Sequence, residues 1–279
     1  MLMSDEVQLS RQEREGIWEE HKGWVVDVGA QIAAETGLKF PDGVLVVPPA
    51  EDGVSHVGSG NGAEHTYLPS KNKHLLAFAG SRFLPHGGDK AWHEGTHLFV
   101  SAYNTNDKQI RRLVDDVPGS KEQLVDRVTR EVARVVMEEM VAAHLEVVKS
   151  ERLVDIEVMG MVDAAYADWD RVNEIVNNCR DGDFVGVDQR VYRDLLKDLR
   201  EPATMVGYFF GDVLSRSGAE LDLKSLLLLD PVDVFALTWD YVAEGRIGRI
   251  GFEHDFAGDI CQLPSYVENR GATKRSQVD

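Results

Sequence analysis

Residues 89–103 read DKAWHEGTHLFVSAY. We predict a helix over this range, with Asp89 at its N-cap, because a short acidic side chain there can accept from the first free backbone amides. His93 and His97 stand four residues apart, so on a helix they share one face, with Cβ atoms about 5–6 Å apart. Apolar neighbours such as Trp92 indicate that this helix is buried, and a buried helix would hold both imidazoles rigidly.

His93, Glu94 and His97 carry the chemistry that we predict for this helix. Two imidazoles in this arrangement can both reach one tetrahedral zinc ion at about 2.0–2.1 Å. Glu94 would stand beside the metal rather than bind it. From there it can take a proton from zinc-bound water and pass it to a leaving amine. A five-residue HExxH pattern also arises by chance, so the alternative is an ordinary helix with two histidines.

A third zinc ligand has to come from another segment. The extended pattern HExxHxxGxxH fails, because Val100 and Tyr103 stand where it requires glycine and histidine. We predict the next long helix over 120–150. At a rotation of about 100° per residue, Glu139 lies at the centre of its apolar stripe. A carboxylate among valines is costly unless it meets a cation. Glu139 is therefore the predicted third ligand.

Two further glutamates, Glu138 and Glu146, lie on the same predicted helix as Glu139. Glu146 returns to the same stripe two turns later and is the second choice. Glu138 falls about 100° away, toward Arg127 and Arg134. We interpret Glu138 as a solvated residue in surface ion pairs. For Glu139 itself, the alternative to a metal is an ion pair with an arginine in the core.

The chain around these two helices is organised as follows. We predict a helix over 10–36 that ends at Gly37, and a buried strand over 43–47. A hairpin of strands 64–68 and 74–79 comes next. Further helices are expected at 153–178, 188–200, 203–217 and 231–245. The predicted domains are a core at 10–150, a helical region at 151–265 that is either separate or part of the same domain, and flexible tails at 1–9 and 266–279.

The composition narrows the class of protein. A net charge of −18 over 279 residues would repel a phosphate backbone, so nucleic acid is not an expected partner. The sequence has only two cysteines and no CxxC pair, which indicates a reducing compartment and no thiolate zinc site. No apolar stretch approaches the roughly 20 residues of a membrane span. We therefore expect an acidic, cytoplasmic protein that does not bind a membrane.

With His93-Glu94-x-x-His97 and a glutamate 42 residues further on, the chain resembles the zincin metallopeptidases, and among them the gluzincins. The resemblance covers residues 10–150. It implies an α+β, predominantly helical fold, in which a small twisted sheet packs on the HExxH helix and on the glutamate-bearing helix, followed by a helical C-terminal region. One departure is Ala143, because many gluzincins have an acidic residue four positions after the third ligand.

The resemblance also implies a function. The chain would be a zinc metallopeptidase, a hydrolase that holds one Zn²⁺ per chain through His93, His97 and Glu139 and uses Glu94 as the base. A peptide or protein substrate would pair with the edge strand of the sheet, either 64–68 or 74–79. The oligomeric state stays open. The alternative is a catalytically silent zincin-fold protein, regulatory or structural, that binds zinc without turnover.

Such enzymes also need a side chain that stabilises the oxyanion. The candidates in this sequence are Tyr166, Tyr208, Tyr241 and His254. His86, just before the HExxH helix, could line the same cleft. We expect the remaining histidines to be scattered and to form no second metal site.

Overall fold

A computed structural model describes residues 9–49, 63–68, 71, 73–78, 87–149, 158–182 and 187–275. These residues are predominantly helical, with one small mixed sheet, as the sequence predicts. The chain forms two compact units, residues 1–102 and 103–279. The long glutamate-bearing helix belongs to the second unit, together with the helices that follow it. The expected division near residue 150 stays a prediction.

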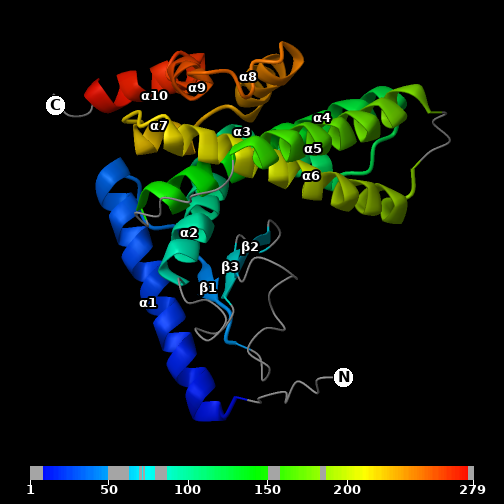
Figure 1. The fold of residues 1–279 in the computed structure, drawn as a ribbon. Coiled ribbons are helices and arrows are strands. Elements are labelled where there is room, and N and C mark those ends of the chain that lie inside the picture. Colours follow the sequence, from blue (N-terminus) through cyan, green and yellow to red (C-terminus); the bar gives the residue numbers. More distant parts are fainter. Residues whose placement is uncertain are drawn as a thin grey trace, which may run out of the picture. The chain divides into compact units, whose positions relative to one another are not determined.

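The described part of the first unit consists of helices α1 and α2 and the sheet (Figure 1). Its elements are α1 (Arg11–Thr36), β1 (Val44–Val46), β2 (Ala63–Leu68), β3 (Lys73–Phe78) and α2 (Gly87–Tyr103). Helix α1 begins and ends as predicted. Ser10 and Glu13 form a reciprocal capping box at its start, and Gly37 ends it with a φ of 69°.

The sheet has the strand order β1-β3-β2. Strands β2 and β3 are antiparallel, so the predicted hairpin is confirmed, whereas β1 runs parallel to β3. Because β3 is the central strand, the expectation that 74–79 could be an edge is wrong for the described sheet, in which β2 is an edge. Side chains alternate between the two faces of a strand. In this register His65, Tyr67 and His74 therefore share one face.

Helix α2 begins at Gly87, two residues before the expected cap at Asp89. Residues 91–101 are all buried, as the apolar flanks of the motif predict. Gly95 lies against α1, because a Cβ atom at this position would come within 2.8 Å of the Val28 side chain. The small residue inside HEGTH is thus required by the packing of α1 on α2.

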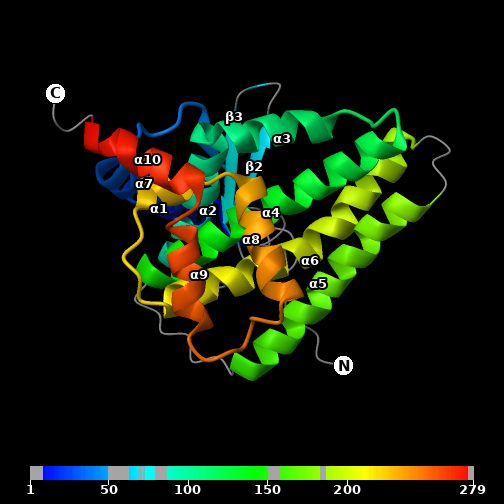
Figure 2. The same cartoon turned by 90° about the horizontal axis from the view of Figure 1, so that it is seen from above.

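The second unit is built around α4. Its elements are α3 (Thr105–Asp115), α4 (Lys121–Lys149), α5 (Val158–Asp181), α6 (Gln189–Arg216), α7 (Leu223–Leu227), α8 (Pro231–Ala243), α9 (Phe252–Ile260) and α10 (Pro264–Arg275). Helices α3, α5, α6 and α8 all pack against α4, and Figure 2 shows α4, α5 and α6 side by side. As a result, α4 is buried around most of its circumference.

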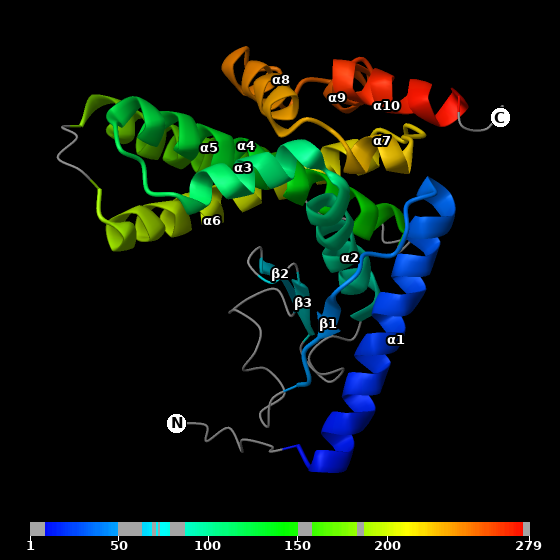
Figure 3. The ribbon, with the colours of Figure 1, turned by 180° about the vertical axis from the view of Figure 1, so that it is seen from behind.

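Two predictions for the C-terminal half are corrected. The expected helices 188–200 and 203–217 are one helix, α6, which continues through Pro202. The expected flexible tail from 266 is wrong for its first ten residues, because α10 runs to Arg275 (Figure 3). Tyr266 is fully buried, and its hydroxyl accepts a 2.8 Å hydrogen bond from the Asp222 backbone amide. The tail expected at 1–9 falls almost wholly outside the described residues.

None of the described helices combines the length and the apolar character that crossing a membrane requires.

Candidate metal centre

His93 and His97 face one another on α2. Their Nε2 atoms are 3.2 Å apart, and their rings are inclined at 72° with centroids separated by 4.8 Å. Their exposed fractions are 4% and 8%. The predicted i, i+4 arrangement is confirmed, and both nitrogen atoms are directed into the same space.

This separation fits two ligands of one zinc ion. With bonds of about 2.0–2.1 Å and tetrahedral angles, two ligand atoms on zinc stand about 3.3–3.4 Å apart. The observed 3.2 Å between the two Nε2 atoms is close to that edge. Glu94, between the two histidines in sequence, is 4% exposed. The donor set of α2 is therefore suited to zinc without any rearrangement of the histidine pair.

Glu139 lies on α4 and is half-buried. Its Oε1 atom accepts a 3.5 Å hydrogen bond from the Thr204 hydroxyl on α6. The backbone of α6 approaches closely at this point, since a Cβ atom on Gly207 would come within 2.6 Å of the Glu139 Cβ. The prediction that Glu139 sits on the packed side of its helix agrees with these contacts.

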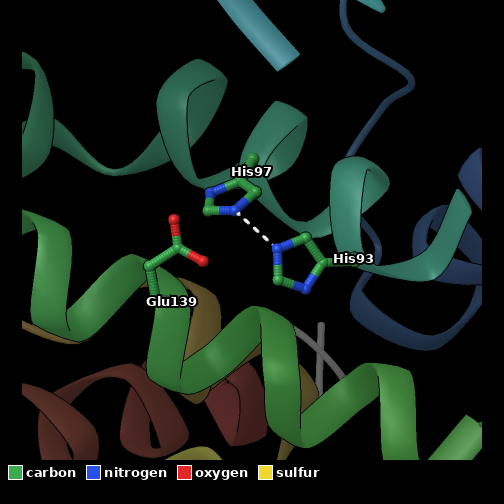
Figure 4. Close-up of side chains that lie close together, drawn as sticks. All are labelled: His93, His97 and Glu139. Atoms are coloured by element: carbon green, nitrogen blue, oxygen red, sulfur yellow. Dashed lines mark hydrogen bonds between the residues drawn. The ribbon is translucent and has the colours of Figure 1, made fainter. Parts of the chain in front are cut away.

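Among the described residues, His93, His97 and Glu139 form the one group that could hold a metal ion. Figure 4 shows the side chains of His93, His97 and Glu139. Glu146, the second choice from the sequence, is not part of this group.

Glu138 is not the solvated residue that the sequence predicts. It is 4% exposed and accepts hydrogen bonds from Arg111 and Arg134. Arg134, itself 5% exposed, also donates to Glu131 at 2.7 and 2.8 Å. The sequence predicts that Glu138 lies toward Arg134, but it does not predict that this ion pair is buried. A helical wheel cannot show that α3 and α6 cover the polar face of α4.

The same buried cluster shifts the pKa of two carboxyl groups in opposite directions. Burial by itself raises the pKa of Glu131, but the guanidinium groups of Arg134 and Arg200 outweigh burial and lower the pKa to about 2. For Asp107, burial and the nearby charge of Glu138 raise the pKa to about 6. The carboxylates of this cluster are thus engaged in ion pairs with arginines. This explains why none of them belongs to the group of potential metal ligands that contains Glu139.

Sequence reasoning missed a second set of imidazoles near α2. His65 Nε2 lies 3.1 Å from His74 Nδ1, and Ser101, one turn after His97, places its Oγ atom 3.3 Å from the same nitrogen. The His65 ring is parallel to that of His97, within 4°, at a centroid distance of 6.3 Å. Tyr67 stacks on His74 at 4.6 Å. These histidines are not scattered, although only the sheet register brings them together.

The structure separates the candidates for the oxyanion residue. Tyr241 is fully buried and donates a 2.8 Å hydrogen bond to Asp259, so it has a structural partner. Tyr208 follows Thr204 by one turn of α6, on the same face of that helix. The other two candidates lie on α5 and α9, and His86 falls outside the described residues.

Comparison with known proteins adds no relative. No protein-family model matches the sequence, and searches of curated proteins and of solved structures found no match.

Proposed function

We propose that this chain is a zinc-dependent peptidase that binds one metal ion through His93, His97 and Glu139. The observation that carries the proposal is the HExxH pair itself. Both histidines lie on a buried helix with their Nε2 atoms 3.2 Å apart, which is close to the spacing of two zinc ligands. Three protein ligands would leave the fourth tetrahedral position open, as in catalytic zinc sites.

The metal ion and Glu94 would have different roles in hydrolysis. A zinc ion held there would supply a Lewis acid that polarises the peptide carbonyl and lowers the pKa of water. Glu94 takes the proton from the attacking water molecule and delivers it to the leaving amine. Glu94 is 4% exposed and directly follows the proposed ligand His93 in the buried helix α2.

Substrate binding is assigned to the edge of the sheet. Strand β2 is an edge of the described sheet, and an extended peptide can add to such an edge through backbone hydrogen bonds. Among the candidates for the oxyanion residue we favour Tyr208, because it shares the face of α6 on which Thr204 reaches Glu139.

Metal content and hydrolysis test the proposal together. Wild-type protein, purified with zinc, should contain about one zinc per chain by native mass spectrometry and should cleave an unstructured protein such as casein. Glu94→Gln should keep the zinc and lose about 10²- to 10⁴-fold in kcat. Glu139→Gln should lose the zinc, whereas Glu146→Gln, on the same stripe of the same helix, should keep it.

Each result has a distinct meaning. A wild-type protein that takes up no zinc would leave HEGTH as a chance pattern and end the proposal. Zinc without cleavage of any peptide, and no effect of Glu94→Gln, would support the catalytically silent zinc protein instead. If Glu146→Gln loses the zinc and Glu139→Gln keeps it, the third ligand is Glu146 rather than Glu139.

A further inference from the structure

The packing of α6 on α4 suggests a role for a helix that lies outside the part of the chain resembling the gluzincins. Along α6, Thr204, Gly207, Gly211 and Ser215 recur at intervals of three and four residues, so they form one face of the helix. Every one of them contacts α4 or would do so through a single added carbon atom. This face lets the two helices approach closely.

The closest approach occurs at Glu139. A Cβ atom on Gly207 would lie 2.6 Å from the Glu139 Cβ and 2.8 Å from the Val136 carbonyl oxygen. Real Cβ atoms do not approach other atoms this closely, because the repulsion at such distances is prohibitive. Gly207 therefore sets the distance between the helices at the residue that we assign as the third ligand.

One turn before Gly207, Thr204 reaches the carboxylate itself. Its hydroxyl donates to Glu139 Oε1 at 3.5 Å. A hydrogen bond to one carboxylate oxygen restricts rotation about the last side-chain torsion of Glu139. Groups that hold metal ligands in this way raise metal affinity, because the ligand side chain loses less conformational freedom when the metal binds.

The same packing explains the absence of an acidic residue at position 143. A Cβ atom on Gly211 would come within 2.7 Å of the Ala143 Cβ. Ala143 is 4% exposed, so the close approach of α6 leaves no space for a longer side chain. Support for the metal site from this position of α4 is therefore sterically blocked, while α6 brings a hydroxyl group to Glu139.

We propose that Thr204 is a positioning residue for the metal ligand Glu139. The inference rests on the proposed function, since it assumes that Glu139 binds zinc. In this proposal α6 orients the third ligand. Thr204 does so through its hydroxyl group, and Gly207 does so by allowing the close approach of α6 to α4.

Zinc affinity of the full-length protein, measured by competition with a chromophoric chelator, tests the inference without any activity assay. Thr204→Val keeps the shape of the side chain and removes the hydroxyl, and we expect it to weaken zinc binding about tenfold. Thr204→Ser restores a hydroxyl and should bind zinc within about twofold of wild type. Urea unfolding of the zinc-free proteins should show that the valine variant is still folded.

Ser215→Ala provides the matched control. It removes a hydroxyl from the same face of α6, but that hydroxyl contacts His144, at 3.2 Å, rather than Glu139. Its zinc affinity should equal that of wild type. Equal affinity of Thr204→Val and wild type, or an equal loss in Ser215→Ala, would overturn the role of Thr204 while leaving the metal site standing. A wild-type protein without zinc would instead refute the site.

Discussion

Replacing Glu138 by alanine should destabilise the fold strongly while leaving the metal ligands intact. Glu138 is the acceptor for Arg111 and Arg134, whose side chains are 20% and 6% exposed. The cluster balances three carboxylates, on Asp107, Glu131 and Glu138, against the guanidinium groups of Arg111, Arg134 and Arg200. Removal of Glu138 leaves one excess positive charge in a largely buried site.

The size of the effect follows from what remains. Breaking a buried ion pair by deleting one partner costs about 3–5 kcal/mol, because the other charge stays buried. Arg134 keeps Glu131, and Arg111 keeps Asp107 at 2.7 Å. We therefore expect a loss near the lower end, about 3 kcal/mol of unfolding free energy. The pKa of Asp107 should fall in this variant, because the charge of Glu138 is one of the causes that raise it.

Urea unfolding with and without EDTA, followed by circular dichroism, measures this loss. A slope of about 3 kcal/mol per molar urea, at the upper end for small proteins, would convert it into a midpoint about 1 M lower. Glu139→Gln is the neighbouring control and should change the zinc-free midpoint little. Folded Glu138→Ala should still bind one zinc per chain. A loss below about 1 kcal/mol would refute the reasoning about the buried cluster, and loss of zinc by the folded variant would assign Glu138 to the site.

Two further predictions concern the second unit. Burial lowers the pKa of His144 from 6.5 to about 4, so the unfolded chain takes up a proton that the folded chain excludes, and stability is lost as the pH falls through this window. Between pH 7 and pH 5 this costs about 2 kcal/mol. His144→Gln should abolish that part of the pH dependence in zinc-free urea unfolding, and an unchanged slope would contradict the shift. Asn104 caps α3 through Oδ1 and donates from Nδ2 to the carbonyls of Leu227 and Leu229. Asn104→Ala should cost about 2–3 kcal/mol, and Asn104→Asp should recover only the capping part; if Asp fully restores the midpoint, the two carbonyl contacts contribute nothing.

Features that depend on residues close together in the chain could be predicted from the sequence. The limits of α1 follow from the Ser10 capping box and from Gly37, which involve residues within one turn of each helix end. The facing of His93 and His97 follows from the helical repeat alone. The antiparallel pairing of β2 and β3 follows from two short strand patterns that lie close together in the sequence. In each case the determining interactions lie within a few residues of one another in the chain.

Predictions failed where the deciding neighbour was distant in sequence. Glu138 has the helical-wheel position of a solvated residue, yet α3 brings Arg111 onto it. The sequence predicts a flexible tail over 266–279, yet α10 extends to Arg275. Tyr266, in the first turn of α10, accepts a hydrogen bond from the backbone amide of Asp222. His65 and His74 are unremarkable in sequence and become neighbours only through the register of the sheet.

The sequence by itself therefore determined the histidine pair, the glutamate beside it and the type of those elements that it predicted, because helical periodicity, caps and turns act over a few residues. Only the tertiary structure decided which glutamate of α4 is held in buried ion pairs, which strand is central in the described sheet, and which side chain of α6 contacts Glu139. Burial is a property of the surroundings that other segments create. A helical pattern specifies which residues share a face, but not what packs against that face.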